Sequence, residues 1–565
     1  LALAAAETLR QEEPERYAAL GLTEKETEGW RKLREAIPVP RDPATGRLWP
    51  DDTFHLLEPV DPAALKEGDE ASYHKVCFDR LQRYQVIKQA DTLLLMTRLP
   101  DRFTGEEKKN AWEKYPQGPE REKLFAFAED YRRFISGCKT ERECTASVYA
   151  DATGHGFVDL DELIETGKSV KAGDKIIANN MGKGLALFIV GSKPLEKGMN
   201  ILGAHIDSPR LDLKPNPLYE DTGFAYFKTH YYGGIKKYQW TTIPLSIHGV
   251  IAKANGEKIL VNIGEDENDP IFVITDLLPH LAQDQMEKKL KNGIDGEDLN
   301  LLLGNIPYGN KSEAEAVKLN ILNILNQKYD ITEADLLSSE LEVVPAFKAR
   351  SLGFDGSMVA AYGQDDKVCA YTSLKAMMSL ENVKTTAICI LSDKEEIGSM
   401  GNTGMESHVF DYFISELLNK TGENRTNLLD KVFCFSKMLS ADVDAGFDPL
   451  YASVSDRHNA GYLGKGISLN KYTGARGKSG ASDANAEYVA WVRNVLEKND
   501  IKYQVAELGK VDVGGGGTIA YILANKGVDV IDCGIPLLSM HSPYEVTSKF
   551  DIYSAYRTYK SFWEE

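Results

Sequence analysis

Apolar residues after residue 105 follow the periods of helices and buried strands. In residues 120–138 (EREKLFAFAEDYRRFISGC) they recur at helical spacing, which predicts an amphipathic helix. The short apolar runs KIIANN, LALFIV and NILGAH predict buried strands. Beyond residue 355, helix-like and strand-like segments alternate, as in VCAYTSLKAMMSL followed by TTAICIL, and in GTIAYILANKGVDVIDCG. This alternation predicts an α/β domain with a mixed sheet.

A different pattern occupies residues 217–352. The stretch THYYGGIKKYQWTTIPLSIHGVIAKANGEKILVNIGE alternates β-branched and aromatic residues with polar ones, and Asn255-Gly256 is a turn signal. We therefore expect a β-rich insertion that divides the α/β domain into residues 106–216 and 353–565. The aromatic segments HYYGG and KKYQW look exposed, which is typical of an interface. Residues 1–105 are charged and interrupted by prolines, and we interpret them as an extension of unknown role.

The composition of the chain limits which partners and which cellular location we expect. The chain has 565 residues, a net charge of −19 and a pI of about 5.2, which argues against nucleic acid and anionic membranes as partners. No apolar run approaches the ~20 residues of a membrane span. The seven cysteines are irregularly spaced, without a CxxC motif, which favours reduced thiols and a cytoplasmic protein. The start LALAAAE is either the trimmed tail of a signal peptide or a truncated or processed cytosolic start, and the lack of a basic segment and the cysteine pattern favour the second.

Side chains that bind metals follow several of the predicted strands. In open α/β sheets the ligand crevice lies outside the carboxyl ends of the strands, so we expect these side chains to converge. Two histidines and several carboxylates are a suitable donor set for a pair of divalent cations. The candidates are His205, Asp207, Asp365, Glu395, Glu396, Asp442 and His541.

Each motif taken alone has an ordinary structural interpretation. His205 and Asp207 could be loop residues, Asp365 could cap a helix, and the pair Glu395-Glu396 could be a solvated turn. Adjacent carboxylates repel each other at a strand end unless a cation compensates them. In the functional interpretation, one glutamate ligates a metal and its neighbour accepts the proton of the attacking water.

The glycine run at residues 514–517 is not a phosphate-binding loop. The Lys-Ser/Thr ending of a P-loop is missing, and so is the GxGxxG spacing. No GxSxG motif occurs, which argues against a serine hydrolase. Because glycine permits a close backbone approach, we expect Gly515 and Gly516 to lie near a substrate.

Taken together, the motifs resemble one enzyme family. AHIDSPRLDLKP, SDKEEIGSMG, SADVDAG and GGGGTIAYILANKGVDVIDCGIPLLSMHSPYE are similar to motifs of the M18 metallo-aminopeptidases, closest to the bacterial branch, over about residues 108–565. The resemblance implies a phosphorylase/hydrolase-like zinc exopeptidase fold. It also implies that residues 217–352 form a dimerisation domain, and that dimers assemble into a tetrahedral dodecamer.

The resemblance also implies a site with two Zn²⁺ ions, with Co²⁺ or Mn²⁺ as possible substitutes. His205 and Asp442 would hold one metal, Glu396 and His541 would hold the other, and Asp365 would bridge them. Glu395 would be the general base and Asp207 would orient His205. Two positions depart from the family. Asp366 stands where asparagine is common and is the alternative bridging residue, and PHLAQDQ has Asp284 in place of a histidine that some relatives supply to a neighbouring subunit.

The function we expect is removal of the N-terminal residue from unblocked peptides. Lys471, Arg476 and Lys478 lie in one basic stretch, and any of them that lines the pocket would favour acidic N-terminal residues. The alternative is a solvated basic loop. Two other functions remain open: a metal-dependent deacylase of N-acyl amino acids, and a non-catalytic homologue that only forms a shell.

Overall fold

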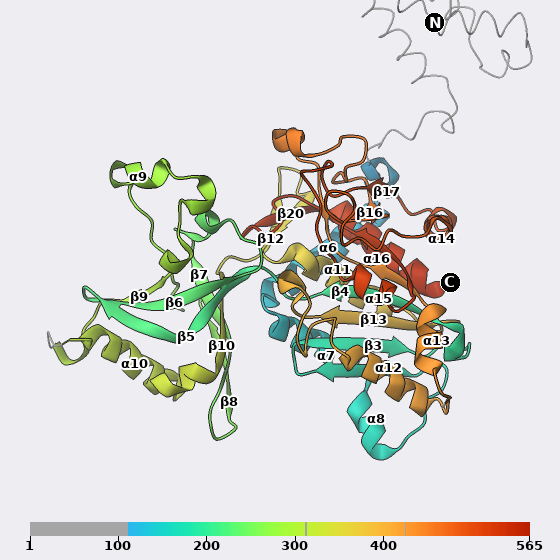
Figure 1. The fold of residues 1–565 in the computed structure, drawn as a ribbon, viewed down its shortest axis with the longest axis horizontal. Helices are drawn as coiled ribbons and strands as arrows, with labels where there is room; N and C mark the ends of the chain where they lie inside the picture. Colours follow the sequence, from blue (N-terminus) through green and yellow to red (C-terminus); the bar gives the residue numbers. More distant parts are fainter. Residues whose placement is uncertain (1–110, 311–313, 424) are drawn as a thin grey trace, which may run out of the picture. The chain divides into compact units, whose positions relative to one another are not determined.

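The computed structural model describes residues 111–310, 314–423 and 425–565 (Figure 1). The chain separates into two units, Leu1–Lys109 and Asn110–Glu565. The extension expected over residues 1–105 lies outside the described residues. Within the described part, no helix has the length and apolar character needed to cross a membrane.

The centre of the second unit is a mixed sheet of nine strands. Strands β13, β4, β14 and β18 run parallel to one another, whereas β2–β3, β3–β13 and β16–β18 are antiparallel pairs. The strands predicted from KIIANN, LALFIV, NILGAH and TTAICIL are confirmed. In spatial order the strands are β1 (Val158–Asp159), β2 (Lys175–Asn180), β3 (Gly184–Ile189), β13 (Thr386–Ser392), β4 (Met199–His205), β14 (Lys437–Ser440), β18 (Asp529–Gly534), β16 (Ile467–Asn470) and β17 (Tyr503–Ala506).

Helices cover both faces of this sheet, which explains its continuous apolar runs. In β13, Ile388 and Ile390 join one core cluster, while Cys389 and Leu391 join the cluster on the opposite face. A strand buried on both faces needs apolar residues at every position. One face is covered by α6 (Pro119–Gly137), α7 (Glu141–Gly154), α11 (Gln364–Met378), α14 (Ala486–Lys498) and α16 (Lys549–Glu564), and the other by α8 (Leu160–Thr166), α12 (Val409–Lys420), α13 (Leu428–Cys434) and α15 (Ala520–Ala524). The helix predicted over residues 120–138 is α6.

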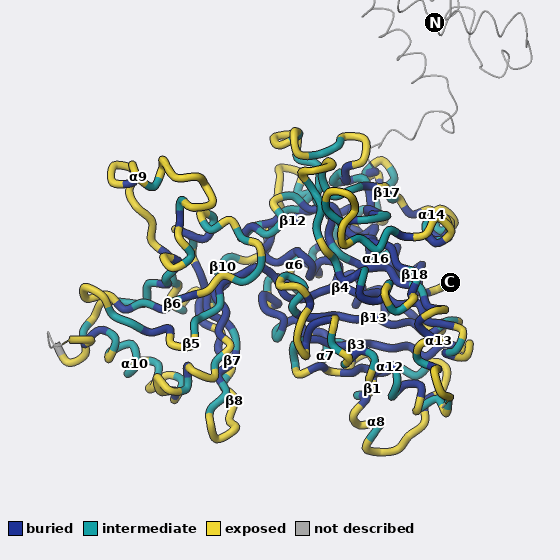
Figure 2. The backbone as a smooth tube through the Cα atoms, in the orientation of Figure 1, coloured by how far each residue is buried: buried dark blue, intermediate teal, exposed yellow. Residues whose placement is uncertain are grey.

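The insertion forms a separate antiparallel sheet. Its strands are β8 (Lys258–Ile263), β7 (Leu245–Ala252), β10 (Ser339–Pro345), β5 (Arg210–Asp221), β6 (Phe224–Tyr232) and β9 (Leu301–Gly304), in spatial order. One face packs with α10 (Ala316–Tyr329), while a loop with the short helix α9 (Gln283–Met286) extends from the sheet (Figure 1). Many residues of the insertion are exposed, whereas the residues of the nine-stranded sheet are mostly buried (Figure 2).

The insertion begins before the expected boundary at residue 217. Strand β5 crosses that boundary, and its register shifts between Leu213 and Leu218, where Pro215 and Pro217 lie. Proline is tolerated at such a bulge, so Pro217 does not mark the start of the sheet. At the other end, β11 (Arg350–Leu352) pairs with β12 (Met358–Ala361), which pairs with β20 (Glu545–Ser548), instead of joining the six-stranded sheet. A further pair consists of β15 (Asp444–Ala445) and β19 (Pro536–Leu537).

The expectation that the aromatic residues of the insertion are exposed is wrong in part. Trp240 is fully buried, and Tyr232 is half-buried beneath the side chain of Arg210. Tyr231 and Tyr238 are each 43% exposed. The sequence pattern could not distinguish these positions because aromatic residues occur on both faces of a half-buried sheet.

Candidate metal centre

The predicted ligands converge at the carboxyl edge of the parallel strands. His205 ends β4, Asp442 follows β14, and Glu395 and Glu396 begin a short 3₁₀-helix after β13. Strand β4 lies between β13 and β14, so the three strand ends are adjacent. Asp365 comes from the first turn of α11 and His541 from the loop after β19. We call His205, Asp207, Asp365, Glu395, Glu396, Asp442 and His541 the strand-end cluster.

His205 presents one ring nitrogen, Nε2, to the other candidate ligands. Its Nδ1 lies 3.1 Å from the backbone oxygen of Asp207 and 3.2 Å from Asp207 Oδ1. Both oxygens are acceptors, which places a proton on Nδ1, so Nε2 is the nitrogen that would bind a metal. His205 Nε2 lies 3.1 Å from Asp365 Oδ1 and 3.9 Å from Asp442 Oδ1.

His541 repeats this arrangement on the other side of Asp365. Its Nδ1 lies 3.0 Å from the backbone oxygen of Gly234, and its Nε2 lies 3.1 Å from Asp365 Oδ2 and 3.5 Å from Glu396 Oε2. The two oxygens of Asp365 therefore each face a different imidazole. This is the geometry expected of a carboxylate that bridges two metal sites.

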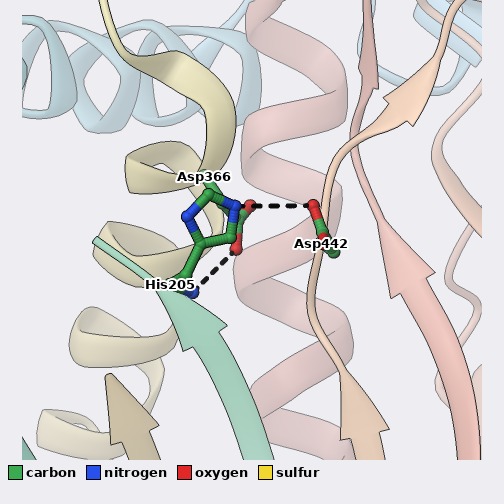
Figure 3. A group of neighbouring side chains, drawn as sticks. All are labelled: His205, Asp366 and Asp442. Carbon is green, nitrogen blue, oxygen red and sulfur yellow. Dashed lines mark hydrogen bonds and ion pairs between the residues drawn. The ribbon is translucent and has the colours of Figure 1, made fainter. Parts of the chain in front are cut away.

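Asp366, the alternative bridging residue, also lies in the centre. With His205 and Asp442 it forms a group whose potential ligand atoms lie within 4.8 Å of one another (Figure 3). His205, Asp365 and Glu396 form a second such group. One oxygen of Asp366 already accepts a hydrogen bond from the backbone N–H of His205, at 3.3 Å, so its side chain also supports the end of β4 (Figure 3).

The carboxylates are poorly compensated by the protein alone. Burial raises the pKa of Glu395 to about 7 and raises the pKa values of Glu396 and Asp442 well above their ordinary range. Burial disfavours the charged imidazole of His541, but its hydrogen bond to Asp365 and the nearby charges of Asp365 and Glu396 together outweigh this and raise the pKa to about 10. Glu396 Oε1 and Asp366 Oδ1 are buried and have no hydrogen-bond partner among the described residues. Divalent cations fit this set, because they would neutralise the carboxylates and occupy the unpaired oxygens.

The sequence reasoning missed Glu545. This residue is 1% exposed, and its two side-chain oxygens accept hydrogen bonds from the backbone N–H groups of His541, at 2.8 Å, and Asp365, at 3.1 Å. Burial raises its pKa to about 8. Glu545 thus fixes the backbone of two candidate ligands at once. A glutamate four residues after His541 in SMHSPYE was the available signal, but spacing alone does not show that its side chain turns back toward the histidine.

The basic stretch is an exposed loop, which we call the basic loop (residues 471–483). Lys471 Nζ lies 2.5 Å from Asp483 Oδ1, and Lys478 Nζ lies 3.0 Å from Asp483 Oδ2. Lys478 also lies 3.8 Å from the ring centre of Tyr472. Arg476 is exposed and has no ion pair with any residue that the structure describes.

The glycine run (residues 514–517) packs closely against the basic loop. A Cβ atom on Gly515 would lie 2.4 Å from the Cα of Ala475, and the φ angle of Gly515 is +119°. The backbone N–H of Gly516 donates to the oxygen of Thr473 at 2.9 Å. Glycine is needed here because two backbone segments pack against each other. A role of Gly515 and Gly516 toward a substrate stays a prediction.

Comparisons with known proteins agree with this fold. The family model described as "Aminopeptidase I zinc metalloprotease (M18)" matches residues 134–563. A "Probable M18 family aminopeptidase 1" from Clostridium acetobutylicum is 55% identical over 81% of this chain and 98% of its own length. Its counterpart from Thermotoga maritima is 47% identical, with 81% of this chain and 99% of its own length aligned.

Solved structures give the same result. A crystal structure of the M18 aminopeptidase from Thermotoga maritima has a TM-score of 0.77 at 47% identity, covering 81% of this chain and 99% of that one. A crystal structure of aminopeptidase I from Clostridium acetobutylicum has a TM-score of 0.77 at 51% identity, with the same coverage. A second family model, the central catalytic domain of glycosyl hydrolase family 65, matches residues 1–120, which lie mostly outside the described residues.

Fold and site together define a metal-dependent peptidase of the α/β class. The chain belongs to the M18 family of zinc metallo-aminopeptidases. It is accordingly an aminopeptidase, which hydrolyses peptide bonds.

Proposed function

We propose that this aminopeptidase uses two zinc ions to release the N-terminal residue from unblocked peptides. The observation that carries the proposal is the position of Asp365 between the Nε2 atoms of His205 and His541, at 3.1 Å from each. His205 and Asp442 would hold one ion, and His541 and Glu396 would hold the other. When bound, zinc lowers the pKa of water and polarises the scissile carbonyl.

Glu395 is the residue we assign as general base. Its side chain is 16% exposed, against 4% for that of Glu396, so it is the more accessible of the two glutamates. Burial raises its pKa to about 7, close to the value at which a base both accepts and returns a proton efficiently. Glu395 would take the proton of the attacking water and pass it to the leaving amine. Asp207 would hold His205 in its ligating tautomer.

Arg476 is the residue we propose for recognition of acidic N-terminal residues. Lys471 and Lys478 both form an ion pair with Asp483, whereas the guanidinium of Arg476 is exposed and unpaired within the described residues. Its loop packs against the glycine run, which fixes the base of the loop. A cationic side chain that lines the substrate pocket would attract acidic substrates.

We also propose that the chain assembles into a dodecamer built from dimers. A fold relative with a TM-score of 0.63 and 21% identity is described as a dodecamer. The insertion carries large apolar side chains that are exposed in the single chain, such as Leu281 (71%) and Met286 (74%). Such side chains usually mark interfaces.

We propose a cytoplasmic location as well. The described cysteines are all free thiols, which fits a reducing environment: Cys138, Cys144, Cys369, Cys389, Cys434 and Cys533.

The experiment that tests the proposal combines metal analysis with a substrate panel. Purified protein should bind two zinc ions per chain and cleave aminoacyl-nitroanilides, but not N-acyl amino acids. Substitution of His205, Asp442, Glu396 or His541 by alanine should lower the zinc content measured by mass spectrometry. Two zinc ions retained in any of these variants would contradict the assignment at that position.

A further inference from the structure

The end of strand β6 reaches from the inserted sheet to the strand-end cluster. We call residues 232–234 the β6 tip. We propose that the β6 tip positions the metal centre, so that the insertion completes the active site of its own chain. This inference rests on the proposed zinc site. It concerns positioning residues, because the β6 tip contacts the candidate ligands and not the reacting atoms.

Tyr232 supports the cluster through Asp207. The carboxylate of Asp207 is fully buried, and its Oδ2 accepts a hydrogen bond from the hydroxyl of Tyr232 at 2.9 Å. The backbone N–H groups of Glu395 and Glu396 donate to the two oxygens of Asp207, each at 3.1 Å. Asp207 thus joins His205 to the segment that carries both glutamates. Of the described donors to this carboxylate, the hydroxyl of Tyr232 is the one supplied by the inserted sheet.

The next two residues contact the other half of the cluster. The backbone oxygen of Gly234 accepts the Nδ1 proton of His541 at 3.0 Å, which directs Nε2 toward Asp365. A Cβ atom on Gly233 would lie 3.3 Å from Glu396 Oε2, and one on Gly234 would lie 3.2 Å from His541 Nδ1. The two glycines therefore allow the backbone to approach side chains that larger residues would displace.

Arg210 holds the β6 tip in place. It lies directly opposite Tyr232 in the antiparallel register of β5 and β6, and its guanidinium lies 3.9 Å from the centre of the Tyr232 ring. This arginine pairs with Asp212 at 2.8 Å, with Glu342 of β10 at 3.3 Å and with Glu141 of α7 at 3.4 Å. Its counter-ions thus come from both the inserted sheet and the α/β part. Cross-strand and cation–π contacts of this kind fix the orientation of a ring.

Each candidate histidine consequently has a support that depends on the insertion. His205 is oriented by Asp207, which Tyr232 holds, and His541 is oriented directly by Gly234. Residues that orient metal ligands in this way typically change metal affinity or activity by 10–100-fold when they are altered. We expect the β6 tip to act through the geometry of the ligands, and therefore on kcat and zinc affinity more than on KM.

The first test removes one hydroxyl group. Tyr232→Phe keeps the ring beneath Arg210 and deletes the donor to Asp207. We expect zinc affinity, measured by competition with a chelator, to fall about tenfold or more, and kcat to fall by a similar factor with KM within about twofold. Tyr231→Phe is the matched control, because it makes the same change one residue away on a side chain that is 43% exposed. This control should match the wild-type protein.

The second test displaces the imidazole of His541 by adding one methyl group to the β6 tip. Gly234→Ala should weaken zinc binding about tenfold, because the new methyl group meets His541 Nδ1. Gly154→Ala is its control, since a Cβ atom there meets no atom within 4 Å. If wild type binds two zinc ions and neither Tyr232→Phe nor Gly234→Ala differs from its control, the inference is wrong and the zinc site stands. If wild type binds no zinc, the proposed metal centre is wrong and this inference fails with it.

Discussion

The strand-end cluster and the basic loop are both made of charged residues, but they hold those charges differently. In the cluster the ligands are largely buried, and burial moves the pKa of Glu395 to about 7 and that of Glu545 beside it to about 8. In the loop, Lys471 and Lys478 share Asp483 at the surface and lower its pKa. The side chains of the cluster are hydrogen-bonded to several elements of the fold, and the loop packs against the glycine run.

The difference shows how the surroundings decide what a charge can do. Coulomb interactions are stronger away from water, and a buried charge without a partner is costly. The same residue types at the surface contribute little, because water and salt screen them. We therefore expect substitutions in the cluster to have large and specific effects, and equivalent substitutions in the loop to have small ones.

The largest expected effect is that of Glu395→Gln. The amide cannot accept a proton, so turnover should fall by ~10²–10⁴-fold while zinc content stays the same. Asp483→Asn makes the equivalent change in the basic loop and should alter turnover by less than about fivefold. Steady-state rates on an aminoacyl-nitroanilide, with metal analysis of the same samples, provide the measurement. An active Glu395→Gln enzyme would place the base elsewhere in the cluster.

Removal of a ligand should change metal content, not only rate. His541→Ala should lower the zinc content from two ions per chain to one, because Glu396 and Asp365 alone do not complete a site. Lys478→Ala, in the loop, should leave two. Mass spectrometry of the intact protein under native conditions distinguishes these outcomes. Two ions bound to the His541→Ala variant would show that this histidine serves only to orient its neighbours.

Residues near strand ends could be predicted from sequence, but their supporting contacts could not. The apolar runs located β4 and β13, and with them His205, Glu395 and Glu396, because a ligand crevice lies at strand ends. Tyr232 reaches Asp207 only through the pairing of β5 with β6, and this register depends on a bulge at two prolines. Long-range contacts of this kind leave no local pattern in the sequence.

The pH dependence of stability should also distinguish the cluster from the loop. Burial raises the pKa of Glu395 to about 7, above its value in the unfolded chain, so the folded protein without metal binds more protons. Its stabilising contribution is present at low pH and is lost as the pH rises through about 7. The raised pKa of His541, about 10, acts in the same direction at higher pH.

The measurement is thermal unfolding of the chelated protein. We expect the melting temperature to fall by about 2 °C or more between pH 5 and pH 8. Glu395→Gln should weaken this dependence, whereas Asp483→Asn should leave it unchanged. Saturating zinc should remove most of it, because the metal then replaces the protons. A melting temperature that rises over this interval in the metal-free protein would contradict the burial-driven shift.

The smallest expected effect is that of Arg476→Ala. An exposed charge contributes about 0.2–1 kcal/mol to an interaction with an opposite charge, which corresponds to at most about a fivefold change in affinity. We therefore expect KM for a glutamyl-nitroanilide to rise by no more than about fivefold, with no change for a leucyl substrate. Lys478→Ala should do less, because this lysine already forms an ion pair with Asp483. Added salt should reduce the difference between the two substrates in the wild-type enzyme. A 100-fold rise in KM for the glutamyl substrate would mean that Arg476 is desolvated when substrate binds. In that case the loop would act as a buried recognition element during catalysis, and its contrast with the strand-end cluster would hold only for the free enzyme.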